Sequence, residues 1–403
     1  MISIAILGNG VVGSGVVELI QKNNENININ KILVKNKNKH KDNKLFSIIT
    51  DNIKEIVDED VDIIVEAIGG IEPAYDYIKT FLKRKRHVVT ANKDLIAKHG
   101  EELLKIAKEN NVKLYFEASV GGGIPILRPI NECLVGNKVK SIKGILNGTT
   151  NFILTKMHEE GISLKDALTT AQKLGFAELD PTADIKGYDS AKKLAILSNL
   201  AYNKKFDWES FNIEGIENID EYDIDVAKKL GGVIKLIGIS ENFKDGTCIS
   251  VKPAIISKNN ILSKVENEFN SIIIEGDSTG ELAFYGKGAG KLPTASAVYA
   301  DIMNILNNKK EKDLLFNEEK SAIFSDSPNE KDWFIRISTE NRTEIICDIN
   351  KLFNKVYVYS KSSYPQKEVF AIVYNEKEKD LKNKLDSIYN IKKLKITAIL
   401  HSS

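Results

Sequence analysis

The sequence predicts an α/β protein organised around a doubly wound parallel sheet, with two smaller α+β domains after it. A glycine-rich turn, G-x-G-x-x-G at residues 8–13, stands between an apolar strand and a helix. Short apolar strands and longer helices then alternate as far as residue 116, which is typical of a parallel sheet with helices on both faces. Residues 333–400 follow the order strand, helix, strand, strand, helix, strand.

The first predicted strand, Ser3–Leu7, and a helix at 11–22 flank the glycine-rich turn. In this context the glycines let the backbone approach a pyrophosphate, whose negative charge suits the N-terminus of a helix. We therefore predict that a dinucleotide binds at this turn, which consists of Gly8, Asn9, Gly10, Val11, Val12 and Gly13.

Four further strands complete a Rossmann-type domain, which we expect to span residues 1–128. Helices are predicted at 75–83 and 94–111. The strands are predicted at Lys31–Val34, Asp62–Ala67, His87–Thr90 and Lys113–Phe116.

The second of these strands ends at Lys35 rather than at an acidic residue. An Asp or Glu there would hold the ribose 2′-hydroxyl, whereas a cation accommodates a 2′-phosphate. Lys35 and Lys37 therefore favour NADP over NAD. A plain solvated lysine loop explains the same residues nearly as well.

A second glycine-rich turn follows the last of these strands. One carboxylate with several backbone carbonyls is a suitable ligand set for a hard cation, and a purely structural turn is an equal alternative. The residues concerned are Glu117, Val120, Gly122 and Ile124.

We expect a second α+β domain at residues 129–287, then a return helix and linker at 288–325. The return helix is expected to pack on the first domain. The predicted elements are a strand-like stretch at 139–157, a helix at 163–175, strands near Thr247–Ile255 and Asn270–Gly276, the return helix at Ala295–Leu306 and a charged linker at Asn307–Lys312.

Residues 171–193 gather acidic residues and a closing lysine. The periodicity from Asp189 onward is helical, so Asp189 and Lys193 stand one turn apart as surface neighbours. Glu178 and Asp184 lie in the preceding loop. This convergence predicts a chemical site, although each feature alone is also typical of an exposed ion pair or a turn.

The composition favours a protein that acts on small molecules. Lys and Arg total 57 against 56 Asp and Glu, a net charge of +1, so no strong field points to nucleic acid or to an acidic membrane. The three cysteines, Cys133, Cys248 and Cys347, have no metal-binding spacing and favour a reduced, cytoplasmic compartment. We find no signal peptide and no apolar run near the ~20 residues of a membrane helix.

Together these motifs resemble the homoserine dehydrogenase family over essentially the whole chain. The family pattern, Ala-x-x-x-Gly through Asp-Pro to Gly-x-Asp-x-x-x-Lys, is met at every position from Ala171 to Lys193. The stretches Thr90–Lys93 and Asn147–Asn151 also match. The resemblance implies interconversion of L-aspartate 4-semialdehyde and L-homoserine with NADP or NAD, a step toward threonine and methionine.

The resemblance also implies roles for individual residues. Lys193 is expected as the general acid/base, Asp189 as its partner and Lys93 as a second active-site lysine, while Glu178 and Asp184 would bind the substrate. A positioned proton donor suits this reaction, because hydride transfer to an aldehyde builds negative charge on its oxygen.

Further implied contacts concern the cofactor, an ion and the assembly. The turn at Glu117 matches the sodium site of the family, and the protein is expected to form a homodimer or homotetramer. The cofactor-binding residues expected beyond the first turn and Lys35 are Ile68, Gly69, Lys93, Gly175 and Gly290.

The predicted C-terminal domain, residues 326–403, is ferredoxin-like and resembles the regulatory ACT domain. An Asp-x-Pro-Gly-like turn is expected after its first strand, but this chain has Thr339–Thr343 without a glycine. Because the backbone there cannot approach a ligand as closely, we expect weak or absent threonine feedback and a role in assembly. No kinase-like segment precedes Met1, so we expect a monofunctional enzyme.

Two alternatives stay open at this point. In the first alternative, the chain is a different two-domain NADP oxidoreductase that acts on a small aldehyde or hydroxy acid. In the second, it is an inactive nucleotide-sensing regulator. A substrate panel separates the first, and the variant Lys193→Ala separates the second.

Overall fold

The computed structural model describes residues 1–23, 26–307, 322–359 and 364–401. The chain divides into two compact units, and the segments of the two units alternate along the sequence. The first unit consists of Met1–Ile142, Ala191–Ser210 and Phe269–Ser321, and the second of Lys143–Ser190, Phe211–Glu268 and Ala322–Ser403.

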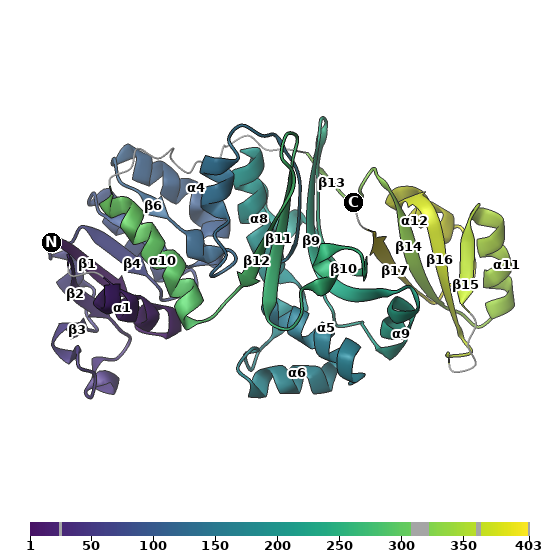
Figure 1. Cartoon of the computed structure of the whole chain (residues 1–403), viewed down its shortest axis with the longest axis horizontal. Helices are drawn as coiled ribbons and strands as arrows, with labels where there is room; N and C mark the ends of the chain where they lie inside the picture. The colour runs from purple at the N-terminus through teal and green to yellow at the C-terminus, as the bar shows by residue number, and fades with distance from the viewer. Residues whose placement is uncertain (24–25, 308–321, 360–363, 402–403) are drawn as a thin grey trace. The chain divides into compact units, whose positions relative to one another are not determined.

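The first unit contains the predicted doubly wound sheet, which is thereby confirmed. All neighbouring strands are parallel, and their order is β3-β2-β1-β4-β5-β6 (Figure 1). The strands are β1 (Ile2–Leu7), β2 (Ile27–Leu33), β3 (Ile49–Thr50), β4 (Ile63–Glu66), β5 (His87–Thr90) and β6 (Leu114–Tyr115).

Two details of this sheet differ from the sequence prediction. The second strand begins at Ile27 rather than at Lys31, because the alternating Ile and Asn residues there pair with β1. The edge strand β3 was not predicted, since it has only two residues and pairs with β2 through Ile49 and Thr50.

The return helix α10 completes the core of the first unit, as predicted. Its residues Ala295, Val298 and Ile302 are buried together with Val16 and Ile20 of α1. The predicted linker lies, apart from Asn307, outside the described residues. The helices of this part are α1 (Val11–Asn23), α2 (Lys54–Val57), α3 (Ala74–Lys83), α4 (Lys93–Glu109) and α10 (Lys291–Leu306).

An antiparallel hairpin of β11 (Phe269–Gly276) and β12 (Gly280–Lys287) also belongs to the first unit. The helix α8 (Tyr188–Tyr202) passes from the second unit into the first, so Lys192 and Lys193 belong to the first unit.

The strand-like prediction for residues 139–157 is wrong in its second half. The strand β7 spans Val139–Ile145, and α5 spans Gly148–Glu160. Asn147 caps this helix, since its Oδ1 accepts a hydrogen bond of 2.8 Å from the N–H of Thr150. The side-chain cap and the burial of the first turns therefore override the strand preference of the β-branched residues.

The second unit contains a long antiparallel hairpin of β9 (Gly232–Phe243) and β10 (Gly246–Ser257). The helices α5 and α9 pack against β9. The remaining elements of this unit before the C-terminal region are α6 (Leu164–Lys173), α7 (Thr182–Ile185), β8 (Asn212–Ile213), α9 (Glu221–Lys229) and β13 (Ile323–Phe324).

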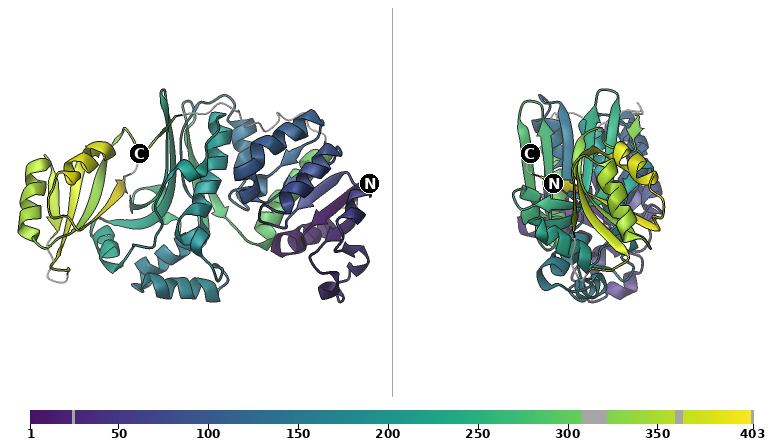
Figure 2. Two further views of the ribbon diagram at one scale, coloured as in Figure 1. Left: turned by 180° about the vertical axis from the view of Figure 1, so that it is seen from behind. Right: turned by 90° about the vertical axis from the view of Figure 1, so that its right-hand side faces the viewer.

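The C-terminal region has the predicted βαββαβ order, with strands arranged β17-β14-β16-β15. Both helices cover one face of these strands, as the yellow-green ribbon shows in Figures 1 and 2. The alternate residues Trp333, Ile335 and Ile337 of β14 lie in that core. The elements are β14 (Glu330–Ser338), α11 (Arg342–Leu352), β15 (Val356–Tyr359), β16 (Glu368–Lys377), α12 (Glu378–Asp386) and β17 (Lys393–Leu400).

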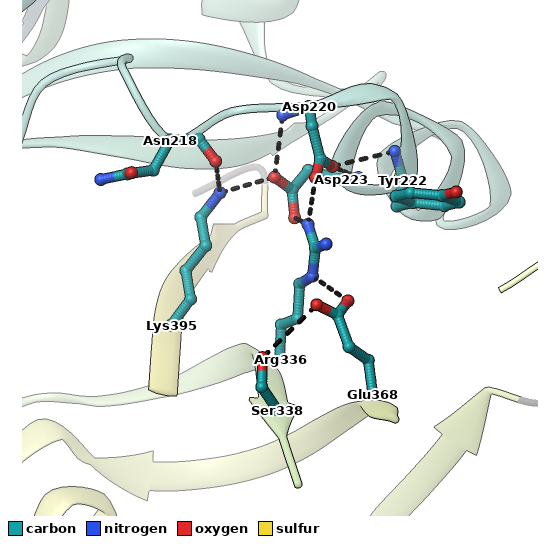
Figure 3. A network of polar contacts seen from close by, with 8 residues as sticks. All are labelled: Asn218, Asp220, Tyr222, Asp223, Arg336, Ser338, Glu368 and Lys395. Carbon is teal, nitrogen blue, oxygen red and sulfur yellow. Dashed lines mark hydrogen bonds and ion pairs between the residues drawn. The ribbon is translucent and has the colours of Figure 1, made fainter. Parts of the chain in front are cut away.

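The opposite face of β14 carries a network of charges centred on Arg336 (Figure 3). Its Nη1 lies 2.7 Å from Oδ2 of Asp220 and 3.3 Å from Oδ1 of Asp223, and its Nε lies 2.6 Å from Oε2 of Glu368. Lys395 of β17 adds a 2.6 Å ion pair with Asp223. The network joins the C-terminal sheet to the start of α9.

Candidate active site

The first glycine-rich turn has no room for side chains at two positions. Gly8 has a φ of +106°, and a Cβ there would lie 2.5 Å from the carbonyl oxygen of Ala67. A Cβ on Gly13 would overlap the carbonyl oxygen of Gly8. The turn therefore folds tightly between β1 and α1, so that the first turn of α1 can point its N–H groups at an anion.

Glu66, at the end of β4, organises the neighbouring loop. Its carboxylate is fully buried. Oε1 accepts hydrogen bonds from the N–H groups of Ile68 (2.8 Å) and Gly69 (3.1 Å). Oε2 accepts a 2.5 Å bond from the hydroxyl of Thr90. Sequence reasoning missed Glu66, although an acidic residue that ends an otherwise apolar buried strand is a usable signal.

Asn92 connects the same loop to the helix that carries Lys93. Its Nδ2 donates to the carbonyl oxygen of Gly70 (2.5 Å), and its Oδ1 caps α4 by accepting from the N–H of Leu95 (3.1 Å). Lys93 is the first residue of α4 and is half-buried. The loop with Ile68 and Gly69 is thus tied to the start of the helix that bears Lys93.

The structure brings the segments of the two predicted active-site lysines together. Nζ of Lys192 lies 2.7 Å from Oδ1 of Asp94, so the helix turns that carry Lys193 and Lys93 are within the combined reach of two side chains. Lys193 is half-buried. Asp189 is on the same helix, four residues earlier, as predicted from the periodicity.

Two predicted carboxylates meet at one amide in the second unit. Nδ2 of Asn147 donates to Oδ1 of Asp184 (2.6 Å) and to Oδ2 of Asp189 (2.8 Å). Asp189 is only 5% exposed. Asn147 itself was not predicted as a site residue, although it opens the Asn147–Asn151 stretch.

Glu178 and Gly175 lie in the exposed loop after α6. Gly175 has a φ of +79°, and the carbonyl of Glu178 accepts a 3.0 Å hydrogen bond from Nε2 of Gln172. Within the part of the chain that the structure describes, the Glu178 carboxylate has no side-chain partner. The structure does not join it to Asp184 or Asp189.

The turn at Glu117 is held by the buried carboxylate itself. Oε1 accepts from the N–H groups of Ile126 (2.5 Å) and Leu127 (2.9 Å), and Oε2 accepts from that of Arg128 (2.9 Å). Oε2 therefore retains a lone pair that can bind a cation. The other predicted sodium ligands, Val120, Gly122 and Ile124, lie on the same turn, where Val120 and Ile124 are buried.

Asp301 of α10 lies behind this turn. Its Oδ2 accepts from the N–H of Glu117 (3.0 Å), and its Oδ1 lies 3.2 Å from Nη2 of Arg128. Burial, together with the charge of Glu117, raises the pKa of Asp301 to about 8. Across the described ranges, the structure contains no cluster of three or more His, Cys, Asp or Glu side chains that could hold a metal.

The two remaining predicted cofactor residues lie in the first unit. Lys35 is exposed just after β2. Lys37 instead places its ammonium 5.1 Å from the centre of the Phe46 ring. Gly290 precedes α10 with a φ of +122°.

None of the helices in the described part of the chain is both long and apolar enough to span a membrane.

Comparison with known proteins matches this chain to two sequence models. Residues 8–117 match the NAD-binding domain of homoserine dehydrogenase, and residues 125–303 match homoserine dehydrogenase. A curated homoserine dehydrogenase of Bacillus subtilis is 44% identical over 319 residues, which cover 77% of this chain and 74% of the relative.

Solved structures agree with the sequence matches. The chain is similar to a homoserine dehydrogenase from Thiobacillus denitrificans, with a TM-score of 0.90, 31% identity and coverage of 99% of this chain and 98% of the other. It is also similar to a hyperthermophilic archaeal homoserine dehydrogenase in complex with NADPH, with a TM-score of 0.64, 31% identity and coverage of 78% and 99%. With its parallel nucleotide-binding sheet and these similarities, the chain belongs to the homoserine dehydrogenase family.

Proposed function

We propose that this protein catalyses the NAD(P)H-dependent interconversion of L-aspartate 4-semialdehyde and L-homoserine. The observation that supports the proposal is the ion pair that joins α4 to α8 beside Lys93 and Lys193. Lys192 and Asp94 are 2.7 Å apart, and they are the chain neighbours of Lys193 and Lys93 respectively. No covalent nucleophile is needed for the reaction.

Lys193 is the proposed proton donor in the reductive direction. The nicotinamide, when bound, supplies the hydride, and charge then develops on the aldehyde oxygen. A half-buried ammonium placed at that oxygen stabilises this charge and delivers the proton. In the oxidative direction the amine takes the proton from the hydroxyl group. Lys93 acts as a second cation at the same oxygen or at the substrate carboxylate.

Carboxylates of the second unit are proposed to orient the substrate and the general acid. Asp184 and Glu178 pair with the α-ammonium of the substrate. Asp189, four residues before Lys193 on α8, is proposed to orient the lysine as its partner. Asn147 supports this arrangement because it donates to both Asp184 and Asp189, and so fixes the orientation of the two carboxylates.

NADP is the proposed cofactor, bound at the first glycine-rich turn and at Ile68, Gly69, Gly175 and Gly290. Lys35 supports a preference for NADP over NAD. It follows β2, at the position where an acidic residue would bind the unphosphorylated ribose 2′-hydroxyl of NAD. The NADPH complex of the archaeal relative is consistent with this assignment.

A sodium ion is proposed at the turn of Glu117. Its ligands would be Oε2 of Glu117 and the backbone carbonyls of Val120, Gly122 and Ile124. The ion would add rigidity to the turn that leads into residues 126–128. Replacing sodium chloride by choline chloride at equal ionic strength tests this: a lower melting temperature in choline supports the site, and an unchanged one contradicts it.

The protein is proposed to be a cytoplasmic homodimer or homotetramer with an ACT-like C-terminal domain that serves assembly. Light scattering of the purified protein tests the oligomeric state, and a monomer would contradict it. Millimolar threonine is expected to leave turnover nearly unchanged, because the turn at Thr339–Thr343 has no glycine. Clear inhibition would overturn that expectation.

One initial-rate experiment tests the central proposal. Purified protein is given aspartate semialdehyde with NADPH or with NADH, and oxidation of the cofactor is followed by absorbance. We expect turnover with both and a higher kcat/KM with NADPH. Small aldehydes without an α-amino group serve as comparison substrates. Equal rates with these would favour a different oxidoreductase, and no turnover with any would favour a nucleotide-sensing regulator.

A further inference from the structure

A partly buried ion pair joins α8 to α4 next to both proposed active-site lysines. Nζ of Lys192 donates to Oδ1 of Asp94 at 2.7 Å, although the residues are 98 positions apart in the sequence. The side chains of Lys192 and Asp94 are only 21% and 33% exposed to solvent, respectively. A pair of this kind is better shielded from water and salt than a surface pair, so it is held more firmly.

Trp208 also contacts this lysine. The ammonium of Lys192 lies 5.0 Å from the centre of the Trp208 ring, a distance at which a cation and an aromatic face attract each other. Trp208, Asp94 and Lys192 line the same cavity of about 320 Å³. Lys192 therefore contacts both a carboxylate and an indole ring.

Because of the geometry of an α-helix, the contact of Lys192 also fixes the orientation of its neighbour Lys193. Successive residues of an α-helix point about 100° apart, so fixing Lys192 against Asp94 also fixes the direction in which Lys193 leaves α8. On α4 the same holds for Asp94 and Lys93, which are the first two residues of the helix.

We propose that Asp94 and Lys192 are positioning residues for the reaction. Their ion pair sets the rotation of α8 against the first turn of α4, and so the angle at which Lys193 and Lys93 present their ammonium groups to the reacting carbonyl. This inference rests on the proposed catalytic roles of the two lysines. Neither Asp94 nor Lys192 is assigned a contact with substrate or cofactor.

The size of the effect follows from the demands of proton transfer. A displacement of about 1 Å between reacting groups can cost roughly 100-fold in rate. Breaking the pair frees α8 to rotate slightly without removing either lysine. The loss should therefore fall mainly on kcat, while cofactor binding stays nearly constant, because most of the proposed cofactor contacts, at the glycine-rich turn and at Ile68 and Gly69, are left in place.

The test compares variants of the intact enzyme. Lys192→Met keeps the length of the side chain and Asp94→Asn keeps its shape, but both remove the ion pair. We expect either to lower kcat by roughly 10- to 100-fold, with the dissociation constant for NADPH within about twofold of wild type. Lys192→Arg can still bind Asp94 and stack on Trp208 and should restore most of kcat.

A matched control lies across the same cavity. Lys205 and Glu101 form a second ion pair that also connects the chain after α8 to α4, but neither residue adjoins a proposed catalytic lysine. Lys205→Met should leave kcat within about twofold of wild type. If Lys205→Met lowers kcat as much as Lys192→Met does, general helix packing explains the effect and the proposal is wrong.

The double variant and a pH profile complete the design. Asp94→Asn with Lys192→Met should lose no more than the worse single variant, because the two side chains act as one unit; additive losses would contradict the proposal. A displaced Lys193 should also shift the alkaline limb of the kcat profile in Lys192→Met, and a reduced kcat with an unmoved limb would point to mere loss of active protein.

Failure of this inference differs from failure of the proposed function. If Lys193→Ala retains wild-type turnover, the proposed catalytic role of Lys193 itself is wrong. If Lys193→Ala is inactive while Lys192→Met and Asp94→Asn keep wild-type kcat and pH profile, only the positioning role is overturned.

Discussion

Nη1 of Arg336 lies 2.7 Å from Oδ2 of Asp220, the residue that caps α9. Oδ1 of Asp220 accepts hydrogen bonds from the N–H groups of Tyr222 and Asp223, so one acidic side chain both caps the N-terminus of α9 and binds the C-terminal sheet. The guanidinium is largely buried and also reaches Glu368 (Figure 3). Arg336 therefore links β14 to the start of α9 in the second unit.

Arg336→Met should destabilise the second unit strongly. Removing the guanidinium leaves Asp220, Asp223 and Glu368 close together with less compensating charge, which typically costs about 3–5 kcal/mol for a buried pair. The urea midpoint of the unfolding transition measures the loss. The control is Lys351→Met, which removes an exposed pair with Asp348 and should shift the midpoint only slightly. Equal shifts in the two variants would contradict this account.

Lys193→Ala should abolish the reaction without abolishing cofactor binding. The variant lacks the proton donor, so turnover should fall by at least about 100-fold. Fluorescence titration with NADPH should give nearly the wild-type dissociation constant. Lys173→Ala, an exposed lysine in the last turn of α6, serves as the control. Unchanged turnover in Lys193→Ala would refute the assigned role.

Glu66→Gln should weaken the binding of NADPH. The neutral amide cannot accept as strongly from the N–H groups of Ile68 and Gly69, and its NH₂ group faces the hydroxyl of Thr90. Because bonds to charged groups are worth about 1.5–3 kcal/mol, we expect the dissociation constant to rise roughly 10-fold or more. Glu109→Gln at the exposed end of α4 should have no effect. Normal affinity in Glu66→Gln would show that the loop does not need the carboxylate.

Lys235 should make stability depend on alkaline pH. The side chain is 3% exposed and donates to Oδ1 of Asn151 (2.9 Å) and to the carbonyl of Val265 (2.6 Å). Burial lowers its pKa to about 8. Between that value and the ordinary pKa of ~10.4, the unfolded chain binds more protons than the folded one. The contribution of Lys235 to stability therefore rises with pH over this range.

The measurement compares wild type with Lys235→Met from pH 7 to pH 10. Urea unfolding should show the wild type gaining stability relative to the variant as pH rises, by up to roughly 3 kcal/mol in total. The difference between the two proteins cancels the titration of the other lysines. Parallel curves would mean that the pKa of Lys235 is the same in the folded and unfolded chain, and would contradict the prediction.

Much of the fold was predictable because its signals are local. The G-x-G-x-x-G turn between a strand and a helix, and the alternating strands and helices after it, correctly predicted the parallel sheet. The stretch after Asn147 was misread, because Thr149, Thr150 and Ile153 favour strands in isolation. Only the side-chain cap of Asn147 and the burial of α5 decide for the helix, and burial depends on the rest of the fold.

The candidate site was predictable where the family pattern names its residues, and less so where contacts between distant residues create it. Lys193, Asp189 and Asp184 were predicted, but Asn147, which joins the two carboxylates, was not. The bond between Lys192 and Asp94 connects residues 98 apart, and no single-sequence pattern encodes such a pair. Glu66 was overlooked for a different reason, since its role depends on the path of the loop after β4.

The position of α10 also bears on how the chain folds during translation. Ala295, Val298 and Ile302 are buried together with Val16 and Ile20 of α1, yet they leave the ribosome about 280 residues later. The apolar residues of α1 that pack against α10 therefore stay without this cover until most of the chain has been synthesised.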